Sequence, residues 1–211
     1  MPFVQTSLFA SRRDEVSLET LDAIPLARRE LSDGAWFDYM RGFVLGHETV
    51  FEVLTRTTAW RTVREQMYDR TVDVPRLVAS VPQDGPGHPL IPRIQQVLFE
   101  TYGEAFTRVS LALYRDGRDS VAWHGDRVAR KMDTALVATV SFGEPRKLLL
   151  RQRGGGPSIG LTLGWGDLFV MGGTCQRTWQ HAVPKVVRAG PRIALMFRPQ
   201  WETPHEDESE Y

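Results

Sequence analysis

The sequence has a single cysteine, no long apolar run and no excess of either charge. With Cys175 alone, no intrachain disulfide can form, and a reduced, cytoplasmic setting is expected. No apolar stretch approaches the roughly 20 residues that cross a bilayer as a helix, so we expect no membrane association. Residues 12 to 15 are all charged, and the N-terminal region has no apolar segment typical of a signal peptide.

The balanced charge of the chain limits the classes of partner that it is expected to bind. Its 26 basic and 26 acidic residues give a formal net charge of zero, which excludes a globally basic nucleic-acid binder but leaves room for a local basic patch. Almost all the cations are arginine, because lysine occurs only at positions 131, 147 and 185, and arginine suits planar recognition of carboxylates and phosphates. The length of 211 residues predicts a single domain, and we expect a monomer.

The first half of the chain predicts two helices and a hairpin. Apolar residues recur at helical spacing in residues 47–57 and again in residues 89–102, where Gly103 follows as a helix-ending residue. Residues 58–82, between the two helices, are polar and aromatic, which indicates a twisted hairpin over the core. The same hairpin is a candidate lid whose side chains contact a ligand. Residues 35–107 are therefore expected to supply N-terminal helices and a substrate lid.

From residue 108 onward the pattern changes to short apolar runs separated by glycine-containing turns. About eight short strands with regular turn signals predict a sandwich, a barrel or a jelly roll. A jelly roll has a mouth at one end, lined by strand termini. The expected strands cover residues 109–114, 121–124, 136–142, 148–151, 159–163, 168–171, 178–183 and 193–197.

A histidine and a carboxylate, His124 and Asp126, stand two residues apart at the end of an expected strand. Residues i and i+2 of a strand point to the same face, so an imidazole and a carboxylate would project into one space. This is two thirds of the 2-His-1-carboxylate triad that holds Fe(II) and leaves coordination positions open. The alternative is a solvated surface turn. His181, late in the strand array, is the candidate third ligand, whereas His88 and His205 lie in a loop and in the tail.

Two arginines, Arg192 and Arg198, flank the last expected strand. Their spacing of six residues is even, which places both side chains on one face of the strand, expected to be the interior of a barrel. Buried cations need anionic partners, and a dicarboxylate co-substrate would supply one for each guanidinium. The alternative is an exposed strand with solvated arginines, in which Ile193, Leu195 and Phe197 carry the core face alone.

These motifs, in this order, resemble the AlkB family of Fe(II)/2-oxoglutarate-dependent dioxygenases. The resemblance spans roughly residues 35–199 and is densest from residue 109 onward. It implies an α+β fold with a double-stranded β-helix (jelly-roll) catalytic core in residues 108–199, N-terminal helices and a lid hairpin. Further matching segments are Leu113-Tyr114-Arg115, Val140-Ser141-Phe142-Gly143, Gly166-Asp167-Leu168, residues 179–185 and, in the nucleotide-recognition lid, Pro75-Arg76-Leu77.

The resemblance also implies a reaction. The family uses Fe(II), 2-oxoglutarate and O₂, converts 2-oxoglutarate to succinate and CO₂, and oxidises an N-methyl group that leaves as formaldehyde. The protein is therefore expected to be an enzyme, an oxidative demethylase that repairs N-alkylated bases in DNA or RNA. The implied Fe(II) ligands are His124, Asp126 and His181, and the implied 2-oxoglutarate contacts are Tyr114, Arg192 and Arg198.

Substrate contacts are expected on the lid and around the metal motif. Extruding a base from a duplex costs a few kcal/mol, so single strands are the expected preferred partner. Aromatic side chains would stack the base, and arginines would bind the phosphates. The candidates are Trp60, Met67, Tyr68, Arg76, Arg127, Arg130 and Arg153, with Lys131 and Arg151 on the same phosphate-binding rim.

The chain also departs from the family pattern. Ala112 and Ala194 stand where the family commonly has asparagines that help to hold 2-oxoglutarate, and Arg127 follows the metal motif where repair members tend to carry an acidic residue. With the neutral net charge, these departures favour an alternative, a dioxygenase of the same core that acts on a protein side chain or a small metabolite. A non-enzymatic jelly-roll binding module is a third class, against which the complete set of metal ligands argues.

Overall fold

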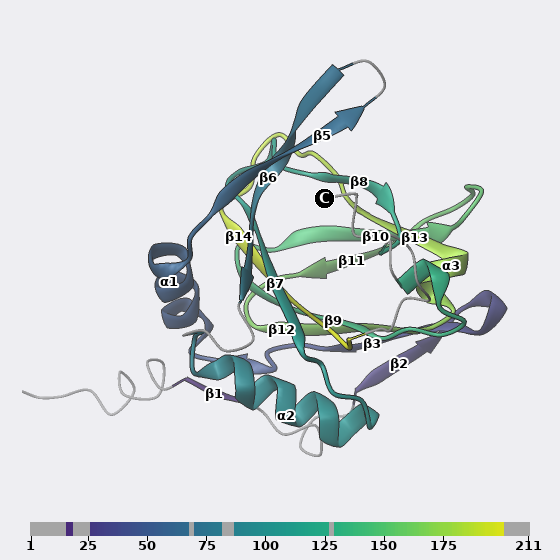
Figure 1. Cartoon of the computed structure of the whole chain (residues 1–211), viewed down its shortest axis with the longest axis horizontal. Coiled ribbons are helices and arrows are strands. Elements are labelled where there is room, and N and C mark those ends of the chain that lie inside the picture. Colours follow the sequence, from purple (N-terminus) through teal and green to yellow (C-terminus); the bar gives the residue numbers. More distant parts are fainter. Residues whose placement is uncertain (1–15, 19–25, 68–69, 82–86, 127–128, 201–211) are drawn as a thin grey trace, which may run out of the picture.

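The computed structural model describes residues 16–18, 26–67, 70–81, 87–126 and 129–200. Figure 1 shows the strands in two curved sheets that face each other, with the helices α1 and α2 outside them. Each of the eight apolar runs predicted between residues 109 and 197 forms a strand, labelled β7 to β14. The fold is therefore the predicted α+β arrangement built on a jelly roll.

The larger sheet has eight strands within the described residues, and neighbouring strands are antiparallel. Its order is β2-β3-β12-β9-β14-β7-β6-β5, so the last strand of the chain lies between β9 and β7. These strands are β2 (Ala27–Glu30), β3 (Ala35–Met40), β12 (Asp167–Gly173), β9 (Val137–Gly143), β14 (Arg192–Arg198), β7 (Arg108–Tyr114), β6 (Arg70–Val81) and β5 (Arg61–Met67).

The smaller sheet has four described strands in the order β11-β10-β13-β8. Its pairs are antiparallel, and the pairing of β13 with β8 is interrupted by a bulge between His181 and Val183. These strands are β11 (Ile159–Leu163), β10 (Arg146–Gln152), β13 (Trp179–Val183) and β8 (Val121–His124). Two further short strands, β1 (Ser17–Leu18) and β4 (Val44–Leu45), pair with each other.

The two longer helices begin and end close to where the sequence predicts. Helix α1 spans His47–Thr57, and α2 spans Leu90–Tyr102. Gly103 ends α2 with φ 73°, a left-handed conformation that glycine adopts without strain, and its N–H donates to the Phe99 carbonyl at 2.8 Å. The other helical segments are η1 (Ser32–Gly34), η2 (Ala129–Lys131) and α3 (Cys175–Thr178).

Two apolar clusters cover the two faces of the larger sheet. An outer cluster joins buried residues of α1 and α2 to one face, and an inner cluster fills the space between the two sheets. In β14, Leu195 belongs to the outer cluster and its neighbour Ala194 to the inner one. Arg192 and Arg198 have the parity of Ala194 and therefore point between the sheets. The prediction that both arginines face the interior is confirmed.

The predicted hairpin is the pair β5 and β6, at the edge of the larger sheet. Figure 1 shows it reaching beyond the other strands, on the side where β8 lies. The Ser120 N–H donates to the Pro75 carbonyl at 2.8 Å, which ties β6 to the start of β8. Trp60, just before β5, packs against the outer cluster and donates its indole N–H to the Thr55 carbonyl at 3.2 Å. Trp60 is therefore partly buried at the edge of the outer cluster, and its role in stacking a substrate base stays a prediction.

A few elements differ from the prediction. Helix α3 occupies residue 178, where a strand was expected to begin, so β13 starts one residue later. Strand β2 has no alternation of buried and exposed residues, because all four of its residues are exposed. Its sequence therefore shows no two-residue hydrophobic period. Most of the loop expected at residues 82–87 lies outside the described residues. Among the described helices, none is long and apolar enough to cross a membrane.

Candidate active site

Two histidines face each other at one edge of the smaller sheet. His124 on β8 and His181 on β13 are directly paired across the strands, and their ring centroids are 4.2 Å apart. His124 Nδ1 lies 2.8 Å from the Ala122 carbonyl, which fixes Nδ1 as the protonated nitrogen and leaves Nε2 able to bind a metal. The strand pairing itself therefore brings the two imidazoles together.

Both histidines are held in the neutral form. Burial lowers the pKa of His124 below its ordinary value. Burial, followed by the nearby charges of His124, Arg198 and Arg76, lowers the pKa of His181 well below its ordinary value. A metal binds only the deprotonated imidazole, so this environment keeps two ligands ready near neutral pH.

Asp126 lies just beyond the end of β8 and bridges the two sheets. Its backbone N–H donates to Gln176 Oε1 at 2.9 Å, and its Oδ1 is 3.4 Å from the donating Ala129 N–H. Its Oδ2 accepts a hydrogen bond from Arg198 Nε, which also makes an ion pair. The carboxylate is thus held between the histidine edge of the smaller sheet and the last strand of the larger one.

The donor set of the two histidines and Asp126 has the chemistry of a metal site. As the described side chains stand, no three of the His, Cys, Asp and Glu residues converge on one point. A carboxylate offers about four lone-pair positions, so Asp126 can bind a metal through one oxygen and keep Arg198 on the other. Two neutral imidazoles and a carboxylate two residues after one of them are the donors of an Fe(II) facial triad.

Arg192 is a buried cation that forms no ion pair within the part of the chain that the structure describes. It is 2% exposed, its Nη2 donates to Ser141 Oγ at 2.7 Å, and its guanidinium carbon lies 5.4 Å from the centroid of the Tyr114 ring. Its Nε is buried with no hydrogen-bond acceptor, and within the described residues no carboxylate pairs with it. Burial lowers the pKa of Arg192. Because a buried, unpaired charge is costly, this position fits a carboxylate supplied by a ligand.

Arg198 stands at the other end of the same strand face. Its Nη1 donates to Ser110 Oγ at 2.9 Å, in addition to its contact with Asp126. Six residues of strand separate the Cα atoms of the two arginines by about 20 Å, and the side chains extend into the interval. Between them Ala194 is paired with Ala112, and both alanines are small and buried in the inner cluster. Arg192 and Arg198 therefore present two cations to one interior, with Ala194 and Met196 on the same strand face between them.

The predicted substrate residues are distributed unevenly. Arg76 Nη1 is 3.4 Å from the Ser120 carbonyl, and its charge contributes to the lowered pKa of both metal-motif histidines, so it lies near them. Arg153 donates from Nε to the Arg177 carbonyl at 2.8 Å and faces α3. Tyr68 and Arg127 lie outside the described residues, and for Met67 and Arg130 the backbone alone is described.

Three polar residues around the site have no signal in the sequence. Gln176 is 1% exposed and joins Asp126 to Met171, whose sulfur lies 3.5 Å from its Nε2. Ser110 and Ser141 accept the hydrogen bonds of the two interior arginines. All three are common residue types outside any motif, and the elements that carry them come together at the site only when the sheets form. The inward parity of both serines on their strands was the one available hint.

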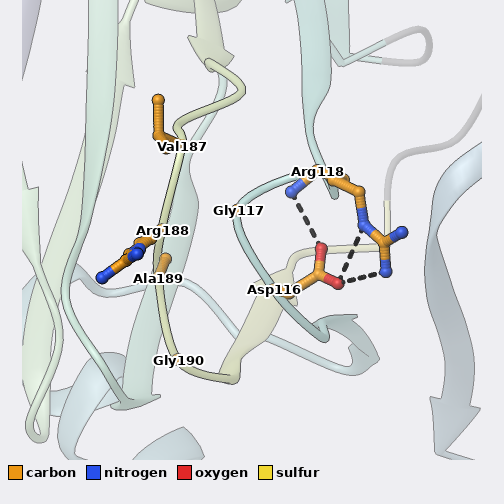
Figure 2. Close-up of a pocket in the computed structure, with 7 residues that line it drawn as sticks. All are labelled: Asp116, Gly117, Arg118, Val187, Arg188, Ala189 and Gly190. Carbon is orange, nitrogen blue, oxygen red and sulfur yellow. Dashed lines mark hydrogen bonds and ion pairs between the residues drawn. The ribbon is translucent and has the colours of Figure 1, made fainter.

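A pocket of about 440 Å³ lies away from the histidines, between the β7–β8 and β13–β14 loops (Figure 2). Asp116 in this pocket is bound by Arg118 at 2.7 Å, and hydrogen bonds from Arg118 lower its pKa to about 2. Its carboxylate is therefore a permanently ionised partner of Arg118 and not a candidate acid or base. The pocket is lined by Asp116, Gly117, Arg118, Val187, Arg188, Ala189 and Gly190.

Comparison with known proteins identifies the class. Residues 47–198 match the 2OG-Fe(II) oxygenase superfamily. The chain belongs to this superfamily, whose co-reactants are Fe(II), 2-oxoglutarate and O₂.

Several of the proteins similar to this chain carry the names of AlkB homologues. The chain is 29% identical over 179 residues to the bovine (Bos taurus) alpha-ketoglutarate-dependent dioxygenase alkB homolog 3, an alignment that covers 74% of this chain and 63% of that protein. It is 33% identical over 135 residues to the DNA oxidative demethylase ALKBH2 of Arabidopsis thaliana, covering 51% and 43%. The solved structure of OsALKBH1 has a TM-score of 0.58 at 12% identity, over 82% of this chain and 100% of that one, which shows a shared fold.

Proposed function

We propose that the protein removes N-methyl groups from alkylated bases in DNA or RNA, with 2-oxoglutarate as co-substrate. The observation that carries the proposal is that one interior holds both a pair of neutral histidines and the unpartnered cation Arg192. The chain is also similar to a DNA oxidative demethylase. The products would be the repaired base, formaldehyde, succinate and CO₂.

The proposed metal ligands are His124, Asp126 and His181. Bound Fe(II), with 2-oxoglutarate and O₂, supplies the oxidising chemistry. Arg198, which contacts Asp126, would bind the 2-oxoglutarate carboxylate nearer the metal. Arg192 would receive the other carboxylate through its unpartnered Nε.

Tyr114 completes the proposed co-substrate site. It is paired with Arg192 across β7 and β14 and is 4% exposed, so its hydroxyl can hydrogen-bond to the same carboxylate. The protein's contribution is to hold the co-substrate, keep water away from it and aim the methyl group of the substrate.

The substrate proposal rests on positive charge near the mouth. Arg76 places a guanidinium beside the histidine pair, where a nucleotide entering from the lid side would bring its phosphate. On the sequence alone, we also propose phosphate contacts for Arg127 and Arg130, which follow the metal motif. Single strands are the expected form, because a base that is not stacked in a duplex enters a pocket at lower cost.

The test is direct. Iron-loaded protein is incubated with 2-oxoglutarate and oligonucleotides that contain 1-methyladenine or 3-methylcytosine, and formaldehyde and repaired base are measured, with His181→Ala as the inactive control. Release of both products from one substrate supports the proposal. Turnover of 2-oxoglutarate without formaldehyde from any methylated DNA or RNA would instead favour a protein side chain or a small metabolite as substrate.

A further inference from the structure

The smaller sheet carries basic residues and no carboxylate. Strands β8, β10, β11 and β13 contain no aspartate or glutamate, and apart from one histidine on each of β8 and β13, their titratable residues are Arg146, Lys147 and Arg151. In a chain whose formal net charge is zero, this is a local concentration of one sign. Such a surface attracts polyanions.

Among the described residues, none buries the outer face of this sheet as the helices bury the larger one. Along β10, Leu148 and Leu150 point inward and are buried, whereas Lys147 is exposed and Leu149 and Arg151 are half-buried. The residues of β11 that share the outward parity, at positions 160 and 162, are exposed. By contrast, the outer cluster with α1 and α2 covers the corresponding face of the larger sheet. The outward cations of β10 are therefore accessible to a partner.

Arg151 is held in place but has no acceptor. Its guanidinium carbon lies 4.1 Å from the centroid of the Trp123 ring, a stacked cation–π arrangement. Its Nε is buried without a hydrogen-bond partner, and within the described residues none of its N–H groups makes a hydrogen bond or ion pair. On the same strand, Arg146 is bonded to three backbone carbonyls, those of Asp116, Asp119 and Pro184. Arg151 is thus oriented by Trp123 with donors left for an anion.

Its position connects this surface with the candidate active site. Trp123 immediately precedes His124, so Arg151 lies over the residue next to the metal motif. Lys147 is four residues back on the same outward row of β10, about 13 Å away along the strand. The row runs from the rim of the site down the outer face of the sheet.

We propose that the surface formed by Trp123, Arg151 and Lys147, here termed the Trp123 platform, binds the phosphates of a single-stranded nucleic acid that flanks the base in the active site. This inference rests on the proposed function. A row of cations beside an aromatic ring is the usual way of holding a single strand without reading its sequence, and phosphates supply the acceptors that Arg151 lacks. An acidic peptide is the other polyanion to be tested.

The experiment measures binding of a fluorescent single-stranded oligonucleotide of about a dozen nucleotides, with one methylated base, to the iron-loaded protein across a salt series. The variants are Arg151→Gln, Lys147→Gln and the double variant, and the matched control is Arg93→Gln on the exposed side of α2. Each platform variant should weaken binding about tenfold or more, because a charged hydrogen bond is lost. Each should also flatten the salt slope by about 0.7 per phosphate released. Arg93→Gln should match the wild type.

Two comparisons complete the design. Trp123→Leu keeps both cations but removes the ring that orients Arg151, so it should also weaken binding, and equal thermal unfolding of all variants shows that they are folded. On a methylated trinucleotide, too short to follow the row to Lys147, the loss caused by Lys147→Gln should shrink toward zero. A loss that stays the same on the trinucleotide would overturn the flanking role.

The outcomes separate this inference from the proposed function. If the wild type demethylates oligonucleotides but the double variant binds them as Arg93→Gln does, the Trp123 platform is wrong and the function stands. If polyglutamate displaces the oligonucleotide at equal charge concentration, the partner is an acidic peptide and the inference is overturned. If the wild type neither binds nor demethylates any oligonucleotide, the proposed function fails and the inference fails with it.

Discussion

Replacing Arg192 by methionine should affect stability and co-substrate binding in opposite directions. The guanidinium is 2% exposed and has no carboxylate partner among the described residues, so its desolvation is poorly compensated in the free protein. Exchanging such a buried charge for an apolar side chain of similar length is often neutral or stabilising by about 1–4 kcal/mol. The Ser141 hydroxyl loses one hydrogen bond, which costs about 1 kcal/mol. Without 2-oxoglutarate, Arg192→Met should therefore unfold with a free energy equal to or above that of the wild type.

With 2-oxoglutarate the difference in stability shifts by about 2.3 kcal/mol in favour of the wild type. A hydrogen bond to a charged group is worth about 1.5–3 kcal/mol, so the affinity for 2-oxoglutarate should fall about 10- to 150-fold. At a concentration about 100 times the wild-type Kd, the ligand stabilises the wild type by about 2.7 kcal/mol. A variant whose Kd is about 100-fold weaker gains only about 0.4 kcal/mol under the same conditions.

The assay is denaturant unfolding of iron-loaded protein under argon, with and without 2-oxoglutarate, for the wild type and Arg192→Met. Arg192→Lys is the matched control, because it keeps the charge but loses the planar fork. The reasoning is refuted if Arg192→Met loses several kcal/mol of stability without 2-oxoglutarate and still gains the wild-type increment when it is added. That result would make Arg192 a structural cation and not a co-substrate ligand.

Four further substitutions test the rest of the candidate site. His124→Ala and Asp126→Ala should each lose Fe(II) while the fold remains, and iron stoichiometry equal to that of the wild type would remove both from the metal site. Arg198→Lys should weaken apparent 2-oxoglutarate affinity by about 1.5–3 kcal/mol, measured by uncoupled turnover across a 2-oxoglutarate titration. Gln176→Leu should lower the Fe(II) affinity more than Met171→Leu does, as measured by calorimetry, because only Gln176 bonds to the Asp126 backbone. Equal losses of affinity would mean that Gln176 has a structural role alone.

The sequence predicted the strands and the parity of the interior residues because both are local properties. Alternation along β14 is enough to place Arg192 and Arg198 on one face, and the structure puts both between the sheets. The helix ending at Gly103 is equally local, since it depends on one left-handed glycine. Where alternation is absent, as in the fully exposed β2, no local pattern predicts a strand.

The partners of the charged groups could not be predicted, because they depend on which strands become neighbours. Ser141 reaches Arg192 only because β9 pairs with β14, and Ser110 reaches Arg198 only because β7 pairs with it on the other side. Trp60 likewise has a neighbour that the sequence does not indicate. Its aromatic ring next to arginines favours a substrate-stacking role, which stays a prediction, and the structure adds that the residue packs, partly buried, against the outer cluster.

The contact between Asp126 and Arg198 joins a proposed metal ligand on the smaller sheet to a proposed co-substrate ligand on the larger one. A carboxylate that arrives at Arg198 must share that guanidinium with Asp126, so binding of 2-oxoglutarate and of Fe(II) should be coupled. The coupling must be reciprocal: the factor by which 2-oxoglutarate changes the Fe(II) affinity equals the factor by which Fe(II) changes the 2-oxoglutarate affinity. Calorimetric titrations with the two ligands added in both orders measure this coupling factor. Arg198→Lys should alter the factor. Arg192→Lys, which is remote from Asp126 along β14, should change the 2-oxoglutarate affinity with a smaller effect on the coupling factor. Equal changes in the coupling factor for both variants would show that Asp126 and Arg198 do not link the two sites.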